Sequence, residues 1–335
     1  MAVPLIDPFS RRVKDLRISI TDRCNFRCTY CMPEEGMQWL PRDELLTYEE
    51  LARIARVCVE RFGFEAVRVT GGEPLVRAHI TRLIEMLSPL GVDIALTTNG
   101  VRLPELAHDL RAAGLERVNV SLDTLRRETF LALTRRDELD RVLAGIDAAL
   151  HAGLNPVKVN AVVIRGVNDD EVVDLARFGR EKGVGVRFIE FMPLDAQGQW
   201  SNEQVVPADE ILERIDAVFP LQAHPHAEHI EPAARYAFAD GIGDVGVIPS
   251  VTEPFCESCD RVRVTAEGKF RTCLFALDEF DLRAVLRAVD GLDAPDLDDR
   301  LAAAIEAAVG TKWAGHNIGN VNFIRPGRSM SQIGG

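Results

Sequence analysis

The feature that most constrains the fold of this chain is a regular alternation of short apolar segments with longer amphipathic ones between residues 16 and 192. The apolar segments are rich in β-branched residues, whereas the longer ones repeat apolar residues at helical spacing, as Leu51, Ile54 and Phe62 do. Strands that alternate with helices are typical of right-handed crossovers and of a parallel sheet covered by helices. The predicted strands are Leu16–Ile20, Ala66–Thr70, Asp93–Thr97, Arg117–Ser121, Val157–Ile164 and Val186–Glu190.

The number of strand–helix units indicates an incomplete barrel. Each unit takes roughly 30 residues, so six fit the span, whereas a closed eight-unit barrel takes about 250 residues. We therefore expect an α/β fold built as an open six-stranded (βα)6 partial TIM barrel. The helical period also places Cys58 in the apolar core. The predicted helices are Thr47–Phe62, Ile80–Ser88, Pro104–Ala113, Leu139–Ala152 and Asp169–Lys182.

The pattern changes near residue 193, which predicts two parts, residues 1–193 and 194–335. We expect the second part to form a smaller layer over the mouth of the barrel. Its last 25 residues have no clear periodicity. The elements predicted here are a polar loop, a helix, a glycine-rich hairpin, a short strand and an acidic helical segment, at Asp195–Gln204, Ala208–Phe219, Tyr236–Val247, Arg261–Thr265 and Asp278–Val309.

Composition excludes several classes of function. The formal charge of −13 argues against general nucleic-acid binding, which needs a basic surface. No apolar run approaches the ~18 residues of a membrane-spanning helix. The first residues lack an apolar signal core, so we expect a cytoplasmic protein. Seven cysteines, an odd number without an export signal, do not favour a disulfide framework.

Three of the cysteines, Cys24, Cys28 and Cys31, follow the first predicted strand directly. A structural zinc ion normally takes four protein ligands, and this group supplies three. An iron–sulfur cubane on three thiolates keeps one iron open, and that iron can bind a chelating small molecule. The alternative is a zinc site whose fourth ligand comes from elsewhere in the chain.

A second trio, Cys256, Cys259 and Cys273, again supplies three thiolates. The second Cys-x2-Cys pair of a zinc ribbon is absent, although His316 could complete a zinc site. The competing hypothesis is a second iron–sulfur cluster with an open iron, which faces the first across the barrel mouth.

Cationic side chains occur inside the predicted strands. Arg261 and Arg263 alternate along one strand and therefore share a face. Because a buried cation without a partner is costly, and guanidinium groups suit phosphate oxygens, these residues favour a polyanionic substrate such as a nucleoside triphosphate. Alternatively, each cation pairs with a sheet-end carboxylate such as Glu190, or Arg68 and Lys158 point outward between helices. The other cations of this kind are Arg17, Arg68 and Lys158.

The Cys-x3-Cys-x2-Cys motif after the first strand resembles that of the radical S-adenosylmethionine superfamily. The resemblance implies that the open iron chelates the methionine moiety and that cluster reduction releases a 5′-deoxyadenosyl radical. Tyr30 matches the position that borders the adenine. Gly71-Gly72-Glu73-Pro74, by itself also a plausible turn, matches the methionine-binding element. The residues implied for the S-adenosylmethionine site are Tyr30, Gly72, Glu73, Ser121 and Met192.

The whole order of motifs resembles one family, the GTP 3′,8-cyclases, which act first in molybdenum cofactor biosynthesis. The resemblance covers nearly the whole chain, including the segments 16–28, 254–263 and 273–275 and the terminal Ser331–Gly335, and departs from the family at His79 and Asp260. It implies hydrogen abstraction from C3′ of GTP and formation of (8S)-3′,8-cyclo-7,8-dihydroguanosine 5′-triphosphate. A downstream cyclic pyranopterin monophosphate synthase would use this product, and a low-potential electron donor would supply electrons.

The resemblance also implies a role for each motif. Each cysteine trio would hold one [4Fe–4S] cluster, and the second would meet the guanine. The terminal Gly-Gly would reach into the active site; its alternative is a frayed terminus. The implied GTP contacts are Arg17, Arg68, Thr97, Lys158, Arg261, Val262 and Arg263, and the implied catalytic residues are Arg17, Arg261, Arg263, Gly334 and Gly335.

Two rival functions stay open at this point. A peptide-maturing radical enzyme with an auxiliary cluster would not need the Arg-x-Arg pair or the terminal Gly-Gly. A non-catalytic zinc scaffold would contain zinc rather than iron and sulfide. The sequence does not give the oligomeric state, and a homodimer is a hypothesis.

Overall fold

The computed structural model describes the chain except for residues 1, 196–197, 225–231, 289–290, 320–322 and 335. Its centre is a row of six neighbouring parallel strands, as the sequence predicts. Two of them, β3 and β4, pair with Leu16 opposite Val67. The open (βα)6 arrangement is therefore confirmed. The strands are β3 (Asp15–Ser19), β4 (Ala66–Thr70), β5 (Asp93–Thr98), β6 (Arg117–Ser121), β7 (Val157–Val163) and β8 (Gly185–Glu190).

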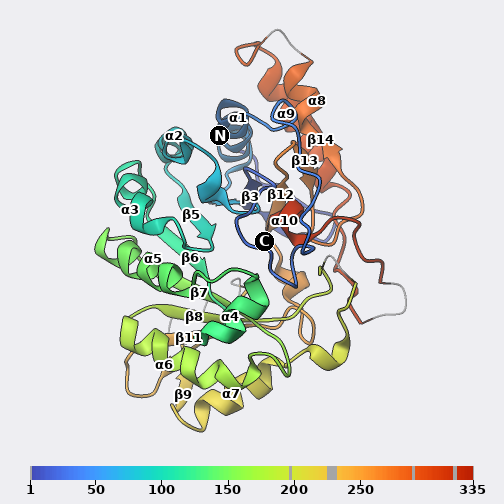
Figure 1. Ribbon diagram of the computed structural model, residues 1–335. Helices are drawn as coiled ribbons and strands as arrows, with labels where there is room; N and C mark the ends of the chain where they lie inside the picture. Colours follow the sequence, from blue (N-terminus) through green and yellow to red (C-terminus); the bar gives the residue numbers. More distant parts are fainter. Residues whose placement is uncertain (1, 196–197, 225–231, 289–290, 320–322, 335) are drawn as a thin grey trace.

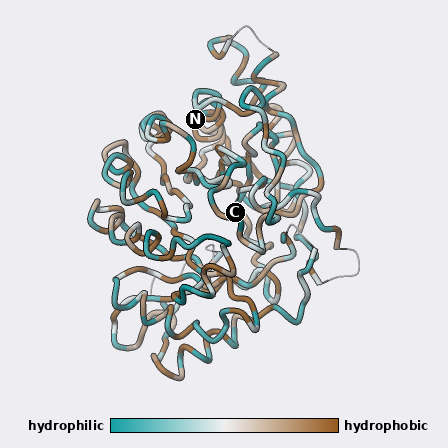
Figure 2. Tube along the Cα trace, in the orientation of Figure 1, coloured by the Kyte–Doolittle hydropathy of each residue, from teal (hydrophilic) through white to brown (hydrophobic). Residues whose placement is uncertain are grey.

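Helices cover the outer face of these strands (Figure 1). In α1, Thr47 and Glu50 form a capping box, and Gly63 ends the helix in the left-handed region at φ 68°. The outer helices alternate hydrophilic and hydrophobic residues along their turns (Figure 2), because only one side of each meets the sheet. Cys58 is fully buried in α1, as predicted. The covering helices are α1 (Tyr48–Phe62), α2 (Ile80–Leu87), α3 (Leu103–Ala112), α5 (Leu139–His151) and α6 (Val172–Lys182).

The carboxy-terminal strands extend the sheet at both edges instead of forming only a layer over the mouth. At one edge β12 (Arg261–Val264) pairs in parallel with β3 and is followed by β13 (Lys269–Arg271) and β14 (Phe280–Asp281). At the other, β11 (Asp244–Ile248) pairs in parallel with β8, and β10 (Ala234–Phe238) and β9 (Leu221–Ala223) follow. The physical reason is that an open parallel sheet leaves unpaired backbone groups at its edges, and short strands satisfy them.

The hairpin and the short strand predicted for this part are present as β10–β11 and β12. The acidic segment from Asp278 is only partly helical, because β14 occupies its start. The remaining strands and helices are β1 (Leu5–Ile6), β2 (Arg12–Val13), α4 (Arg127–Thr134), α7 (Ala208–Asp216), α8 (Leu282–Arg287), α9 (Leu297–Val309) and α10 (Met330–Ile333). Short 3-10 turns lie at Pro74–Val76, Ser88–Leu90, Asp169–Glu171, Asn202–Gln204 and Phe255–Ser258.

The two faces of the central strands differ in chemistry. On β7, Val157, Val159 and Ala161 are buried in the core, and the intervening Lys158 and Asn160 line a cavity inside the barrel. Since side chains alternate along a strand, the strands give most of their apolar residues to the helices and most of their polar residues to the barrel interior. None of the helices in the described part of the chain combines the length and apolarity needed to cross a bilayer.

We predict that Leu51→Ala lowers the free energy of unfolding by about 2–5 kcal/mol, because it removes a fully buried side chain between α1 and the sheet. The matched control is Leu131→Ala on α4, whose leucine is 47% exposed, with an expected change within about 0.5 kcal/mol. Urea denaturation followed by circular dichroism measures both. Equal losses in the two variants would contradict this account of the core.

Candidate active site

A cavity of about 640 Å³ occupies the interior of the partial barrel. Side chains of all six central strands reach it, together with loops that follow them and with Met330 and Ser331 of α10. Its described lining has eight basic and six acidic side chains. The cavity therefore carries positive charge inside a protein whose overall charge is −13.

The first cysteine trio lies in the loop after β3, and all three residues line the cavity. The loop turns tightly, with the Cys31 amide donating to the Cys28 carbonyl at 2.9 Å. Phe26 anchors it by an edge-on contact with Phe130, with the ring centroids 5.7 Å apart. Burial raises the pKa of the Cys24 and Cys31 thiols to about 12, so a metal must displace protons to bind there.

The second trio gathers around β12 and the loop after β13. The charges of Cys259 and Cys273 both act on Cys256, so the three thiols are neighbours. Burial tends to raise the pKa of Cys259, but the cations Arg261 and Lys312 outweigh it and the pKa is lowered. The described lining of the cavity does not include these three cysteines, but it includes their sequence neighbours Phe255, Asp260 and Leu274. The cavity thus extends from the first trio to the residues beside the second.

The donor sets fit clusters better than a single zinc ion. Among the described residues, no group of three or more His, Cys, Asp or Glu side chains is spaced to hold one metal ion. The predicted fourth zinc ligand, His316, instead accepts a hydrogen bond from the Ile318 amide at 3.1 Å and packs on Phe275 with the ring centroids 5.0 Å apart. Each trio supplies three free cysteines, the number of protein ligands that a cubane with one open iron takes.

Three arginines form the cationic wall of the cavity. The buried Nε atoms of Arg17 and Arg261 have no hydrogen-bond partner within the described part of the chain. Burial and the neighbouring cations Arg263 and Arg261 hold the pKa of Arg17 well below its usual value. Burial and Arg261 likewise lower the pKa of Arg263 to about 10. Such crowding of buried cations favours an anionic ligand that separates and neutralises them.

The other predicted GTP contacts are inward-facing with one exception. Arg68 and Lys158 line the cavity, so they do not point outward between helices. Arg68 also pairs with Asp15 at 2.6 Å. Thr97 lies in the lining too. Val262 is fully buried in the apolar core on the opposite face of β12, which leaves only its backbone for a ligand.

The alternative prediction is that the strand cations pair with a sheet-end carboxylate such as Glu190. Within the described part of the chain, Glu190 does not pair with any of them. Its described hydrogen bonds come from the amides of Ala208, Val251 and Thr252 and from the Thr252 hydroxyl. Glu190 thus fastens the end of β8 to the following loops and has a structural role.

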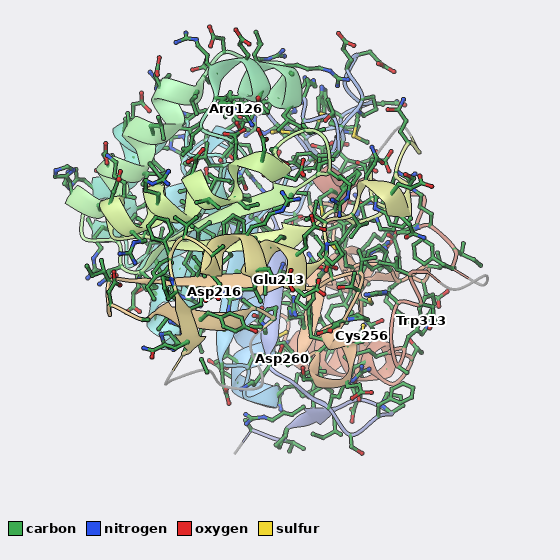
Figure 3. All side chains as sticks on the ribbon, turned by 90° about the horizontal axis from the view of Figure 1, so that it is seen from below. Arg126, Glu213, Asp216, Cys256, Asp260 and Trp313 are labelled. Carbon is green, nitrogen blue, oxygen red and sulfur yellow. The ribbon has the colours of Figure 1, made fainter. Side chains whose placement is uncertain are left out.

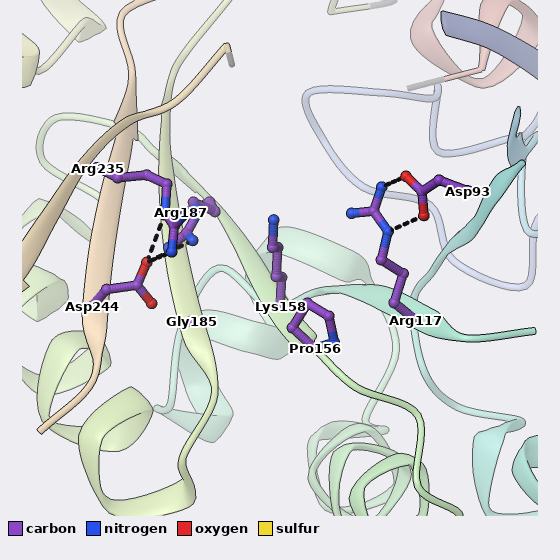
Figure 4. Close-up of a pocket in the computed structure, with 8 residues that line it drawn as sticks. All are labelled: Asp93, Arg117, Pro156, Lys158, Gly185, Arg187, Arg235 and Asp244. Carbon is purple, nitrogen blue, oxygen red and sulfur yellow. Dashed lines mark hydrogen bonds and ion pairs between the residues drawn. The ribbon is translucent and has the colours of Figure 1, made fainter. Parts of the chain in front are cut away.

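A smaller chamber of about 390 Å³ lies where the central strands begin. Lys158 stands between an Asp93–Arg117 ion pair and Asp244, which holds Arg187 and Arg235 (Figure 4). Lys158 and Arg187 line both this chamber and the main cavity. The positive lining therefore continues to the amino ends of the strands.

The residues predicted for S-adenosylmethionine also line the main cavity. The Tyr30 hydroxyl donates to Asp123 at 2.6 Å, and burial raises the pKa of Asp123 to about 6. Glu73 accepts hydrogen bonds from the Thr98 hydroxyl and the Asn99 amide at 2.7 and 2.6 Å, while burial raises its pKa to about 7. Glu73 thus stabilises the end of β5 as well as bordering the cavity. The lining members of the predicted set are Tyr30, Gly72, Glu73, Ser121 and Met192.

The carboxy-terminal tail enters the site. The Gly334 carbonyl accepts a hydrogen bond from Arg263. A Cβ atom at Gly334 would lie 2.3 Å from Ser19 Oγ and 2.8 Å from Thr70 Cγ2, so only glycine fits against β3 and β4 here. Arg328 fixes the tail through 2.5 Å ion pairs with Glu267 and Glu279. The last predicted residue, Gly335, lies outside the described residues.

Several lining residues were missed in the sequence. Arg117, Asn119, Asn160 and Arg187 line the cavity with the predicted residues. Alternation along a strand could have identified them, because each stands two positions from another inward-facing residue on its strand. Arg328 and Lys312 had no such signal, since their partners come from distant parts of the chain.

Two family models match adjoining parts of the chain. The Radical SAM superfamily model matches residues 18–179, and the Molybdenum Cofactor Synthesis C model matches residues 184–318. The chain is 50% identical to GTP 3′,8-cyclase of Streptomyces coelicolor, over 99% of this chain and 96% of that protein. It is 46% identical to GTP 3′,8-cyclase of Corynebacterium glutamicum, over 99% and 89%. The chain belongs to the GTP 3′,8-cyclase family of radical SAM enzymes.

As a member of this family the chain is an enzyme whose cofactors are two [4Fe–4S] clusters and S-adenosylmethionine. The fold has relatives well beyond the cyclases. The crystal structure of Streptococcus suis SuiB bound to S-adenosylmethionine superposes with a TM-score of 0.57 at 15% identity, over 91% of this chain and 68% of that one. Identity this low supports the likeness of fold alone.

We predict that Arg328→Met frees the tail, because it removes both ion pairs that hold the segment before α10. Amide hydrogen exchange across residues 330–334 should accelerate about tenfold, the factor that ~1.4 kcal/mol of lost local stability gives. Arg300→Met is the control, since Arg300 pairs with Asp296 at a site where both side chains are 52% exposed. Unchanged exchange in the tail of Arg328→Met would show that the ion pairs do not hold it.

Proposed function

We propose that this chain cyclises GTP to (8S)-3′,8-cyclo-7,8-dihydroguanosine 5′-triphosphate, the first step of molybdenum cofactor biosynthesis, inside the barrel cavity. The observation that carries the proposal is that the first cysteine trio lines the same cavity as Arg17 and Arg261, whose buried Nε atoms have no hydrogen-bond partner among the described residues. The similarity to GTP 3′,8-cyclases over nearly the whole chain supports the same conclusion.

We assign the two clusters to the two trios. Cys24, Cys28 and Cys31 bind the first, and Cys256, Cys259 and Cys273 bind the second. With S-adenosylmethionine bound, the first cluster would supply the radical chemistry that removes a hydrogen atom from the substrate. Tyr30, Gly72, Glu73, Ser121 and Met192 bind S-adenosylmethionine. This division follows the two proposed parts of the chain, 1–193 and 194–335.

The cations bind and orient GTP. Arg17, Arg68 and Lys158 contact the triphosphate from β3, β4 and β7, and Thr97 contributes a hydroxyl from β5. Arg261 and Arg263, with the backbone of Val262, bind the substrate beside the second trio. A free primary radical attacks the nearest C–H bond, so the fixed position of C3′ decides the product.

The tail completes this site. Arg263 donates to the Gly334 carbonyl, and Ser331 hydrogen-bonds with Cys31. The proposed role of Gly334 and Gly335 is to close the cavity around GTP and exclude water from the reactive intermediate. The close fit of Gly334 against Ser19 and Thr70 supports it.

The proposed partners outside the chain follow from this reaction. A low-potential electron donor reduces the first cluster, and a cyclic pyranopterin monophosphate synthase takes the product. Both fit a cytoplasmic location. A homodimer stays a hypothesis that light scattering can test.

The direct experiment is an anaerobic incubation of reconstituted protein with S-adenosylmethionine, dithionite and GTP. We expect 5′-deoxyadenosine and the 3′,8-cyclised triphosphate in mass spectrometry. The same incubation with a peptide in place of GTP is the control for the rival radical enzyme. Turnover only with the peptide, or colourless protein with stoichiometric zinc, would refute the proposal.

Iron content tests the assignment of the clusters. The triple variant Cys24→Ser, Cys28→Ser, Cys31→Ser should keep about four of about eight irons, because it loses one cubane. The matching serine variant of Cys256, Cys259 and Cys273 should also keep about four. The control, Cys58→Ser, changes a cysteine buried in the core and should keep all of them. A trio whose loss leaves the iron content unchanged is not a cluster site.

Binding of GTP tests the cationic wall. Arg17→Met should weaken GTP binding about 10- to 100-fold, since a hydrogen bond between charged groups contributes about 1.5–3 kcal/mol. Calorimetry on the anaerobic protein gives the dissociation constant. Arg82→Met, which removes an exposed arginine on α2, is the matched control. An unchanged constant in Arg17→Met would remove this residue from the site.

A further inference from the structure

A buried lysine stands against the second cysteine trio. Lys312 follows α9, and only 3% of its surface is exposed. Its Nζ lies 3.8 Å from Cys259 Sγ, and it donates to the carbonyls of Arg261 and Thr272 at 2.6 and 3.0 Å. One ammonium group thus touches a proposed cluster ligand, the start of β12 and the residue before Cys273.

The residues after Lys312 also pack around the trio. A Cβ atom at Gly315 would lie 3.4 Å from Cys256 Sγ, so this backbone passes close to the sulfur. Arg11 joins the Cys256 carbonyl to those of Trp313 and Ala314, at 2.5 to 2.8 Å. Cys256 and Trp313 accordingly lie on the same side of the molecule (Figure 3). The segment 312–316 is therefore a fixed wall of the second trio.

The negative charge that acts most strongly on Lys312 is that of the Cys259 and Cys273 thiols, whereas the more weakly acting carboxylate of Asp7 pairs with Arg11. Among the described residues the structure contains no ion pair of Lys312, and its two oxygen partners are neutral carbonyls. A buried ammonium needs compensating negative charge, and the nearest source is the thiolate of Cys259. Two carbonyl acceptors alone would be satisfied by a neutral donor.

We propose that Lys312 is the positioning residue of the second cluster: it fixes Cys259 and the Cys273 loop relative to Arg261, and its charge raises the reduction potential of that cluster. The inference rests on the proposed function, because it needs a cluster on the second trio. Reduction adds an electron to an already anionic group, so a cation in contact with a ligand sulfur favours the reduced state.

The test uses the first-trio serine variant, so that any iron–sulfur signal comes from the second cluster. Lys312→Gln keeps a hydrogen-bond donor and removes the charge, and Lys312→Met removes both. Redox titration followed by electron paramagnetic resonance gives the midpoint potential. At a fixed potential we expect the ratio of reduced to oxidised cluster to fall about tenfold in Lys312→Gln, which is ~59 mV for one electron.

Controls separate the charge from folding. Lys182→Met removes a lysine that pairs with Asp147 on the outer surface and should leave the potential unchanged. Lys312→Arg keeps the charge, so it should stay closer to the wild-type potential than Lys312→Gln does. If both neutral variants hold the cluster at the wild-type potential, or if neither folds and only a structural role is left, the proposal is wrong.

The experiment distinguishes failure of the proposed function from failure of the inference about Lys312. If the first-trio serine variant with Lys312 intact holds no iron–sulfur cluster, the second trio is not a cluster site, and the proposed function fails first. If that variant holds the cluster and the neutral substitutions leave its potential unchanged, only the inference about Lys312 fails.

Discussion

The architecture depends on positive charge that the chain buries without fully neutralising it. Arg17, Arg261 and Arg263 face the interior of the barrel, and the Nε atoms of the first two have no hydrogen-bond partner among the described residues. A stable fold tolerates such groups only if the surrounding structure holds them firmly or if a ligand supplies the missing anion. The parallel pairing of β12 with β3 provides the first condition, because it places Arg263 directly opposite Arg17. A nucleoside triphosphate would provide the second.

Because β12 pairs with β3, the proposed parts 1–193 and 194–335 share one sheet. The strand that carries Arg261 and Arg263 is an edge addition to the sheet that carries Arg17 and Arg68. The cavity is therefore a product of both parts, and so is the approach of the tail. Arg263 contacts Gly334, which itself lies against Ser19 and Thr70 of β3 and β4. Strand pairing, cationic wall and tail form one connected unit.

The sequence predicted the parts of this unit that obey a local period. The six central strands follow from the alternation of apolar and amphipathic segments, and the cysteine trios are visible as motifs. The same pattern puts Arg17, Arg68 and Lys158 on strands but leaves open whether Arg68 and Lys158 point into the barrel or outward between helices. It did not predict that β11 and β12 join the edges of the sheet, because pairing between distant strands leaves no local pattern. The contacts of Arg328 with Glu267 and Glu279 are of the same kind. Val262 could have been placed correctly from the sequence. The alternation that turns Arg261 and Arg263 toward the barrel interior turns Val262 into the apolar core.

The two cysteine trios differ in their surroundings, and the difference suits different tasks. The thiols of the first are strongly buried among groups that raise their pKa, with Glu73 acting on Cys24 and Asp123 on Cys28. The second borders Arg261 and Lys312, whose charges lower the pKa of Cys259. Cations beside a cluster stabilise its reduced form, whereas anions and apolar burial disfavour it. For the two clusters proposed at these trios, an anionic setting suits the one that must give up an electron, and a cationic setting suits the one that meets an anionic substrate.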